Sequence, residues 1–216
     1  MTKQNKHPIK TRSLFPDPNK ADEQGVVCYG GEWSALLLLD AYRHGIFPWP
    51  QEDMPILWFS PDPRGVIFFE QLHLSKSFKK WLKKQTYKVT FNTAFAEVMR
   101  ECQKQKRPNQ KGTWILPDMI PCYEDLFKMG YAYSVEVWKG SVLVGGLYGV
   151  NTETYASGES MFHKETNASK LALYKAVQYL SQNGKTWLDT QMVTEVTKSF
   201  GAVEISRKEF LRKIAH

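Results

Sequence analysis

Cysteine is scarce in this 216-residue chain. The three cysteines, Cys28, Cys102 and Cys122, form no C-x-x-C pair, which excludes a disulfide framework and the ligand spacing of a zinc knuckle. A chain of this length buries roughly 70% of its unfolded surface, so its core needs no such links. Unpaired thiols are typical of a reducing compartment, and we expect a cytoplasmic protein.

Long hydrophobic runs are also missing. The longest, Ala35–Leu39, is far shorter than the roughly 20 residues that a transmembrane helix requires. Residues 1–12 are basic, but no apolar segment follows them, so they do not resemble a secretory signal. The sequence has no Walker loop, no H-E-x-x-H pair and no cysteine–histidine cluster. We therefore expect no membrane, no metal and no cofactor.

Positive charge is concentrated in one segment. The chain has 29 Lys and Arg against 22 Asp and Glu, a net charge of +7. Between Lys76 and Lys111, eleven basic residues stand against two acidic ones, so this segment carries +9 and the remainder −2. Such a surplus attracts polyanions, and nucleic acid is favoured over membrane because no apolar helix face accompanies it. The alternative is a lysine-rich helix that is simply solvated.

Hydrophobic periodicity and turn residues outline the elements. Helices are predicted over residues 33–44, 76–84, 92–104, 117–129, 167–182, 193–200 and 207–214. Strands are predicted over residues 65–70, 87–90, 132–138, 142–150, 186–188 and 203–205, with another through Tyr155. Asn92 and Asn167 are the expected caps of their helices. This order predicts an α+β (mixed α/β) fold, with a small N-terminal domain over residues 1–64 and a larger domain over residues 65–216.

Polar side chains stand beside apolar segments at two places. Asp189 and Gln191 follow a short buried strand, and residues two apart on a strand point to one side, so a carboxylate and a carboxamide converge. Glu159 lies between small residues and a pair of large apolar ones, as in the floor of a pocket. Each has a structural alternative. Asp189 would cap the following helix, and Glu159 would lie on the surface or pair with a lysine.

Seven motifs in a fixed order identify a resemblance. They are F-P-W at 47–49, L-W-F-S-P-D-P-R at 57–64, T-W-I at 113–115, V-G-G-L-Y-G-V at 144–150, G-E-S-M-F at 158–162, N-A-S-K at 167–170 and D-x-Q at 189–191. With these motifs, from about Leu14 to Leu211, the chain resembles the leucyl/phenylalanyl-tRNA–protein transferase family.

The resemblance implies a GNAT-like acyltransferase domain that uses aminoacyl-tRNA instead of acetyl-CoA. The chain lacks the Q/R-x-x-G-x-G/A turn that would hold the coenzyme pyrophosphate. Gly145, Gly146 and Gly149 lie within an apolar strand, where glycine indicates a bend or a close backbone approach to a ligand. The implied monomeric enzyme moves leucine, phenylalanine or methionine from tRNA to proteins with N-terminal arginine or lysine, marking them for N-degron-dependent degradation.

The resemblance also implies roles for individual residues. Asp189 would take or polarise a proton of the acceptor ammonium, directly or through Gln191, which orients the amine, while Glu159 would position the acceptor or the ester. Trp49 and Trp114 would stack on the 3′-terminal adenosine. The donor side chain would enter an apolar pocket of four residues, Leu147, Met161, Leu173 and Leu188. The tRNA phosphates would be held by Lys80, Lys83 and Lys84.

Three positions depart from the family pattern. Thr190 replaces a cysteine and is expected to point away from the site, Phe59 replaces a second tryptophan, and Ala156 replaces an aromatic residue near the donor pocket. Three other functions stay open: leucine transfer to acidic N-termini, CoA-dependent N-acetylation, and tRNA binding without transfer. The polar pair at 189 and 191 argues against the last of these.

Overall fold

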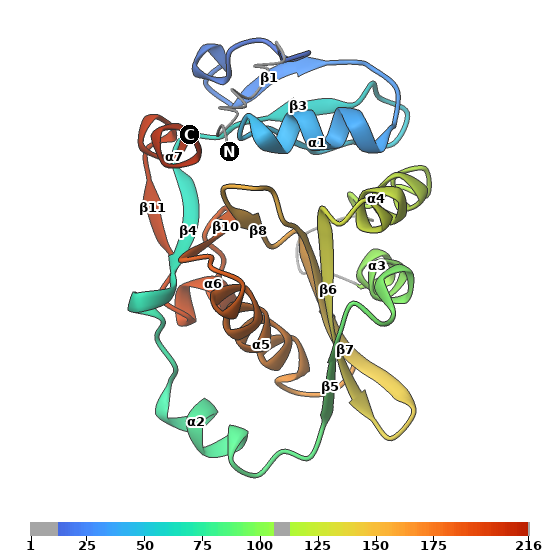
Figure 1. Ribbon diagram of the computed structural model, residues 1–216, viewed down its shortest axis with the longest axis vertical. Coiled ribbons are helices and arrows are strands. Elements are labelled where there is room, and N and C mark those ends of the chain that lie inside the picture. The colour runs from blue at the N-terminus through green and yellow to red at the C-terminus, as the bar shows by residue number, and fades with distance from the viewer. Residues whose placement is uncertain (1–12, 106–112, 216) are drawn as a thin grey trace, which may run out of the picture.

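Helices and strands are interspersed along residues 13–105 and 113–215, the part of the chain that the computed structural model describes (Figure 1). Two short 3-10 helices are η1 Pro18–Lys20 and η2 Phe69–Gln71. The α-helices are α1 Ala35–Arg43, α2 Lys76–Leu82, α3 Phe95–Lys104, α4 Met119–Lys128, α5 Ala168–Gln182, α6 Glu195–Ser199 and α7 Arg207–Ile214. Every predicted helix is present, with ends that differ by at most three residues.

The strands of the described residues form three sheets, ordered β1-β3-β2, β11-β4-β10-β8 and β5-β6-β7-β9. The strand expected through Tyr155 begins one residue later, as β8. The mixed α and β fold class is confirmed. The strands are β1 Val26–Tyr29, β2 Phe47–Pro48, β3 Leu57–Phe59, β4 Arg64–Phe68, β5 Lys88–Phe91, β6 Ala132–Lys139, β7 Val142–Val150, β8 Ala156–Ser157, β9 Ser160–His163, β10 Trp187–Gln191 and β11 Val203–Ile205.

The N-terminal layer consists of the small sheet β1-β3-β2 and α1. The Ser34 hydroxyl accepts a hydrogen bond from Leu37 N and starts α1, and Gly45, at φ 73°, ends the turn after it. The buried Tyr42 hydroxyl of α1 lies 2.7 Å from that of Tyr123 in α4. Apolar residues before and after position 64 share one core, so this layer packs directly on the rest of the chain.

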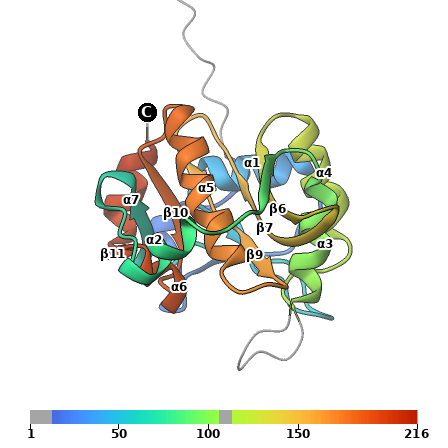
Figure 2. The same ribbon diagram turned by 90° about the horizontal axis from the view of Figure 1, so that it is seen from below.

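The antiparallel sheet β5-β6-β7-β9 is covered on both faces. Helices α3 and α4 lie on one face and α5 on the other, as both views show (Figures 1 and 2). The glycines of β7 allow other segments of this chain, and not a ligand, to approach the strand closely. A Cβ at Gly145 would lie 2.6 Å from the Cβ of Ala168 in α5, and one at Gly149 would lie 1.9 Å from the Ser157 carbonyl oxygen.

The sheet β11-β4-β10-β8 carries Asp189 and Gln191, two of the polar residues singled out in the sequence. Strand β10 pairs antiparallel with β4 and parallel with β8, which places it at the centre. The register between β10 and β4 shifts between Asp189 and Gln191, so the strand bends at these residues. Helix α5 connects β9 to β10 in the chain and lies between the two large sheets (Figure 1).

Neither predicted asparagine cap forms as expected. Asn92, at φ 59°, accepts a hydrogen bond from Ser134 N and donates one to the Tyr179 hydroxyl, so it ties β5 to β6 and α5 instead of starting α3. Asn167 does precede α5, but at φ 67° its side chain accepts no cap hydrogen bond. Within the described ranges, no helix has the length and apolar character needed to cross a bilayer.

Candidate active site

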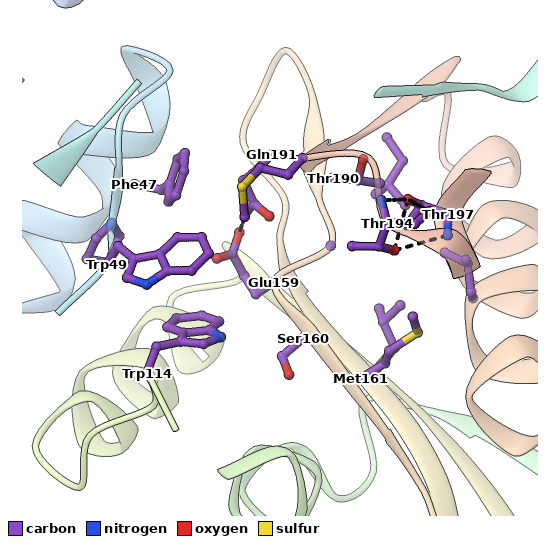
Figure 3. A pocket seen from close by; sticks show the side chains of 16 residues that line it. Phe47, Trp49, Trp114, Glu159, Ser160, Met161, Thr190, Gln191, Thr194 and Thr197 are labelled. Atoms are coloured by element: carbon purple, nitrogen blue, oxygen red, sulfur yellow. Dashed lines mark hydrogen bonds between the residues drawn. The ribbon is translucent and has the colours of Figure 1, made fainter. Parts of the chain in front are cut away.

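A cavity of about 400 Å³ opens where β2 of the N-terminal layer meets β7, β9, β10 and α6. In Figure 3, Trp49 and Trp114 lie on one side of Glu159, while Met161, Thr194 and Thr197 lie on the other. The wall consists of Phe47, Pro48, Trp49, Trp114, Leu147, Gly158, Glu159, Ser160, Met161, Leu173, Leu188, Thr190, Gln191, Met192, Thr194 and Thr197. The cavity is therefore aromatic at one end, apolar at the other and acidic between them.

Behind this wall, Asp189 is completely buried and bound to Arg64. The guanidinium donates from Nε to Oδ1 at 2.9 Å and from Nη2 to Oδ2 at 2.7 Å. The carboxylate does not line the cavity. Asp189 therefore cannot contact an acceptor ammonium directly. Of the two predicted ways for Asp189 to act on that group, only the one through Gln191 is compatible with the structure. The alternative cap role is wrong as well, because Thr194 caps α6.

Gln191 occupies a strained turn at the end of β10. Its φ is 56°, and Met192 N donates to the Thr190 carbonyl at 2.6 Å across it, which makes a γ-turn centred on Gln191. A non-glycine residue in this region costs on the order of 1–3 kcal/mol, and such strain is found mainly at functional sites. The carboxamide Nε2 donates to Glu159 Oε1 at 2.7 Å. The turn therefore holds the carboxamide against the acidic part of the cavity.

Glu159 is a buried carboxyl group that still reaches the cavity. Its Oε1 also accepts from the Ser157 hydroxyl at 2.6 Å, and its side chain pairs with no lysine of the described ranges. Burial raises the pKa of Glu159 to about 7, and the Asp189 charge adds to this, whereas hydrogen bonds from Ser157 and Tyr42 and the Arg64 charge act in the opposite direction. Neither alternative for Glu159, a surface position or a lysine partner, is correct. Such a group exchanges a proton near neutral pH.

Trp49 and Trp114 lie against each other at the aromatic end. Their ring centroids are 6.1 Å apart, with 29° between the planes. The departure at Phe59 keeps this end aromatic, because its ring lies 6.3 Å from Trp49 and from Phe47. The structure thus brings together two tryptophans that are 65 positions apart in the chain.

At the apolar end, all four predicted residues line the cavity: Leu147, Met161, Leu173 and Leu188. Thr190 also lines it, against expectation, although its hydroxyl oxygen is buried and has no hydrogen-bond partner in the described residues. Ala156 does not line the cavity; it is buried in β8 beside Leu188. Ala156 therefore contributes no atoms to the cavity wall itself.

Sequence reasoning missed Arg64 and part of the wall. Arg64 ends the P-D-P-R motif and is the first residue of the buried strand β4, and that position was the signal in the sequence. Met192, which is 44% exposed, and the pair Thr194 and Thr197 belong to a turn and a short helix, where no periodicity marks an inward side.

The predicted phosphate ligands lie elsewhere. Lys80, in α2, and Lys83 and Lys84, just after it, are exposed and do not line the cavity. Helix α2 lies at the opposite end of the molecule from α1 and β3 (Figure 1). Three members of the basic segment, Lys106, Arg107 and Lys111, fall outside the described residues.

Comparisons with known proteins identify the family of the chain. The family model of the leucyl/phenylalanyl-tRNA protein transferase matches residues 66–215, and the model of its N-terminal domain matches residues 31–62. A leucyl/phenylalanyl-tRNA–protein transferase of Flavobacterium johnsoniae is 48% identical over 198 residues, covering 92% of this chain and 93% of that protein. One of Anaeromyxobacter sp. is 46% identical over 200 residues, covering 93% and 85%.

Among solved structures, the comparison found L-PGS from Bacillus licheniformis. It has a TM-score of 0.43 at 10% identity and covers 78% of this chain and 57% of that one. The family assignment rests on the sequence matches alone, which span most of the chain. The chain belongs to the leucyl/phenylalanyl-tRNA–protein transferase family and is an aminoacyltransferase.

Proposed function

We propose that the protein transfers leucine, phenylalanine or methionine from tRNA to the α-amino group of proteins that begin with arginine or lysine, and so marks them for degradation in the cytoplasm. The observation that carries this proposal is one continuous cavity with a tryptophan pair, a buried carboxyl group and an apolar end. We further propose a division into a small domain over residues 1–64 and a GNAT-like aminoacyl-transfer domain over residues 65–216, active as a monomer.

The donor would lie along the cavity. Its adenine would stack on Trp49 or Trp114, and its side chain would enter between Leu147, Met161 and Leu188. Met161 suits a wall that serves both a branched aliphatic and a planar aromatic side chain, because an unbranched thioether repacks easily. The aminoacyl ester then lies near Glu159 and Gln191, which stand between the two ends.

The acceptor would be selected by charge. Glu159 is the one carboxylate that lines the cavity among residues 13–105 and 113–215. A buried carboxylate favours a cationic group that neutralises it and rejects an acidic one, which supports arginine or lysine over aspartate at the acceptor N-terminus. Transfer to acidic N-termini is therefore the weaker candidate.

The chemistry exchanges an ester for an amide. Because Asp189 lies behind the wall, Glu159 replaces it as the proton acceptor in this proposal. Once the acceptor is bound, its α-ammonium group gives one proton to the Glu159 carboxylate, and the Gln191 carboxamide orients the free amine toward the ester carbonyl carbon. The C–N bond forms as the bond from carbon to the tRNA 3′ oxygen breaks. The second amine proton passes to that oxygen, so protons balance and no ATP is consumed. Asp189 takes part by holding Gln191, as its Oδ1 accepts from Gln191 N at 2.9 Å.

The basic segment would bind the tRNA. Lys80, Lys83 and Lys84 are exposed and make no ion pair in the described residues, so their charges are available to phosphates. Contacts to phosphates supply affinity without reading sequence, and the identity of the donor is then decided in the apolar end of the cavity.

The test uses the purified protein, leucyl-tRNA labelled on leucine, and two reporter proteins that differ only in an N-terminal arginine or aspartate. Label on the arginine reporter, without ATP or CoA, is the expected result. Label on the aspartate reporter alone would replace the acceptor assignment. Bound tRNA without any transfer would leave a binding module, and acetylation from acetyl-CoA would show the N-acetyltransferase alternative.

A further inference from the structure

Arg64 is a completely buried cation that serves no surface ion pair. Besides its two bonds to Asp189, Nη1 donates to the Gly45 carbonyl oxygen at 3.1 Å. Two aromatic rings enclose the guanidinium: its carbon lies 4.7 Å from the Phe47 ring centroid and 4.3 Å from that of Phe210. A planar group that forks onto a carboxylate and stacks on rings matches arginine and not lysine.

Four parts of the chain meet at this guanidinium. Gly45 and Phe47 belong to the N-terminal layer, Arg64 begins β4, Asp189 lies in β10 and Phe210 in α7. A buried charge that lost its partner would be strongly unfavourable, so the fork fixes where the Asp189 carboxylate lies.

The position of Asp189 in turn fixes the turn at Gln191. Oδ1 of Asp189 accepts from Arg64 Nε and from Gln191 N, each at 2.9 Å. Gly65, the neighbour of Arg64, lets the turn come close, because a Cβ there would lie 2.6 Å from the Met192 carbonyl carbon. The strained backbone at Gln191 is therefore held from both sides by the beginning of β4.

We propose that Arg64 is a positioning residue for aminoacyl transfer, which acts through Asp189 to hold the Gln191 carboxamide in its productive orientation. The inference rests on the proposed function. Arg64 itself touches neither substrate nor cavity, since it is fully buried and absent from the wall. Its loss leaves the tryptophans and the apolar end in place, so it lowers kcat and leaves KM for both substrates near wild type.

The test is a double-mutant cycle of R64K and Q191A, read as single-turnover leucine transfer to the arginine reporter. A displacement of a reacting group by about 1 Å lowers the reaction rate on the order of 100-fold. We expect R64K to lower kcat by about that factor in the wild-type background, with KM within about 2-fold, and to have almost no effect in the Q191A background. R43K is the matched control, because Arg43 also forks onto a carboxylate, that of Glu153, and lies over the Tyr131 ring, away from the cavity.

Several outcomes overturn the proposal. Equal losses from R64K in both backgrounds mean that Arg64 does not act through Gln191, and unchanged kcat in R64K means that its position does not matter. If R64K fails to fold by circular dichroism, the same cycle is run with D189N, which keeps an oxygen for Gln191 N. A wild-type protein that transfers nothing refutes the proposed function itself, which is a separate result.

Discussion

Two glutamates of this protein are buried almost equally but used differently. Glu136 is 0% exposed, and its two oxygens accept from the hydroxyls of Thr90, Thr93 and Ser134 and from Ala94 N. Glu159 is 9% exposed and accepts from Ser157 and Gln191 on one oxygen. The first carboxylate anchors the loop between β5 and α3, and the second lines the cavity.

The difference separates burial from function. Both groups lose water on folding, and both are compensated by hydrogen bonds from the protein. Only Glu159 has a cavity in front of it, so only Glu159 is placed to exchange a proton with a bound molecule. In this fold, access to the cavity distinguishes the two carboxyl groups, and burial by itself does not.

The most direct test of the difference between Glu159 and Glu136 is to replace each glutamate by glutamine. We expect E159Q to lower the single-turnover transfer rate by about 10²- to 10⁴-fold, because the amine loses its proton acceptor. E136Q should change this rate less than about 3-fold while lowering the free energy of unfolding by about 1–3 kcal/mol, since a hydroxyl donor loses part of its acceptor. Equal rate losses at a temperature where both variants are folded would remove the distinction.

The pH dependence of stability sharpens the account of Glu159. Its pKa of about 7 in the folded state stands above the usual glutamate pKa of 4.5, so the folded state binds more protons than the unfolded state between these pH values. The favourable contribution of protonated Glu159 to the free energy of unfolding is complete below pH 4.5 and is lost as the pH rises through 7. The glutamine of E159Q does not titrate, so this variant does not lose the contribution. The free energy of unfolding of E159Q relative to that of wild type should therefore increase by roughly 2–3 kcal/mol between pH 4.5 and pH 8. Urea unfolding across this range measures the difference, and a constant offset would contradict it.

Tryptophans near the two glutamates extend the comparison to binding. W49A and W114A should each weaken binding of a non-hydrolysable leucyl-adenosine analogue by about 1–3 kcal/mol, because each removes a stacking surface. Trp138 supplies the matched control, as its Nε1 donates to Thr90 in the Glu136 cluster, away from the cavity. Calorimetric titration of W138A should give the wild-type Kd. A loss in W138A as large as in W49A would refute the stacking assignment.

The lysines of α2 and the turn after it lie away from the cavity, and their proposed role is to bind the tRNA of the donor. Replacing Lys80, Lys83 and Lys84 together by glutamine should reduce the slope of log binding constant against log salt by at most about 0.9 for each lost phosphate contact. Turnover of leucyl-adenosine should not change. Fluorescence titration with tRNA at several salt concentrations measures the slope, and K128Q, which removes a lysine paired with Asp125, is the control. An unchanged slope in the triple variant would contradict the tRNA assignment.

Much of the fold follows from local sequence signals. Periodicity and turn residues predicted α5 and α1 to within two residues at each end, because both are local features. The caps at Asn92 and Asn167 were predicted wrongly, since both residues adopt a left-handed backbone, and the Asn92 side chain bonds to β6 and α5. Local propensity does not reveal such tertiary partners.

The sequence predicted several residues of the site, but it did not predict which of them line the cavity and which lie buried behind it. Motif order placed Glu159, Gln191, Trp49 and Trp114 together, and the structure has all four on one cavity wall. Alternation along β10 put Asp189 on the same side as Gln191, whereas the bulge and the γ-turn between them move Asp189 behind the wall. The partner of Asp189 is 125 positions away, and no spacing rule in the sequence reports it.

The ring of Phe210 against Arg64 also bears on how the protein is made. The groups around this guanidinium belong to residues 45, 47, 189 and 210, so one side of the enclosure comes from α7, which follows α6 in the chain. A growing chain that has emerged only as far as α6 has the tryptophans, Glu159 and Gln191 but not this side of the enclosure. The Arg64 guanidinium is therefore enclosed on this side only after α7 has been synthesised and has packed against it.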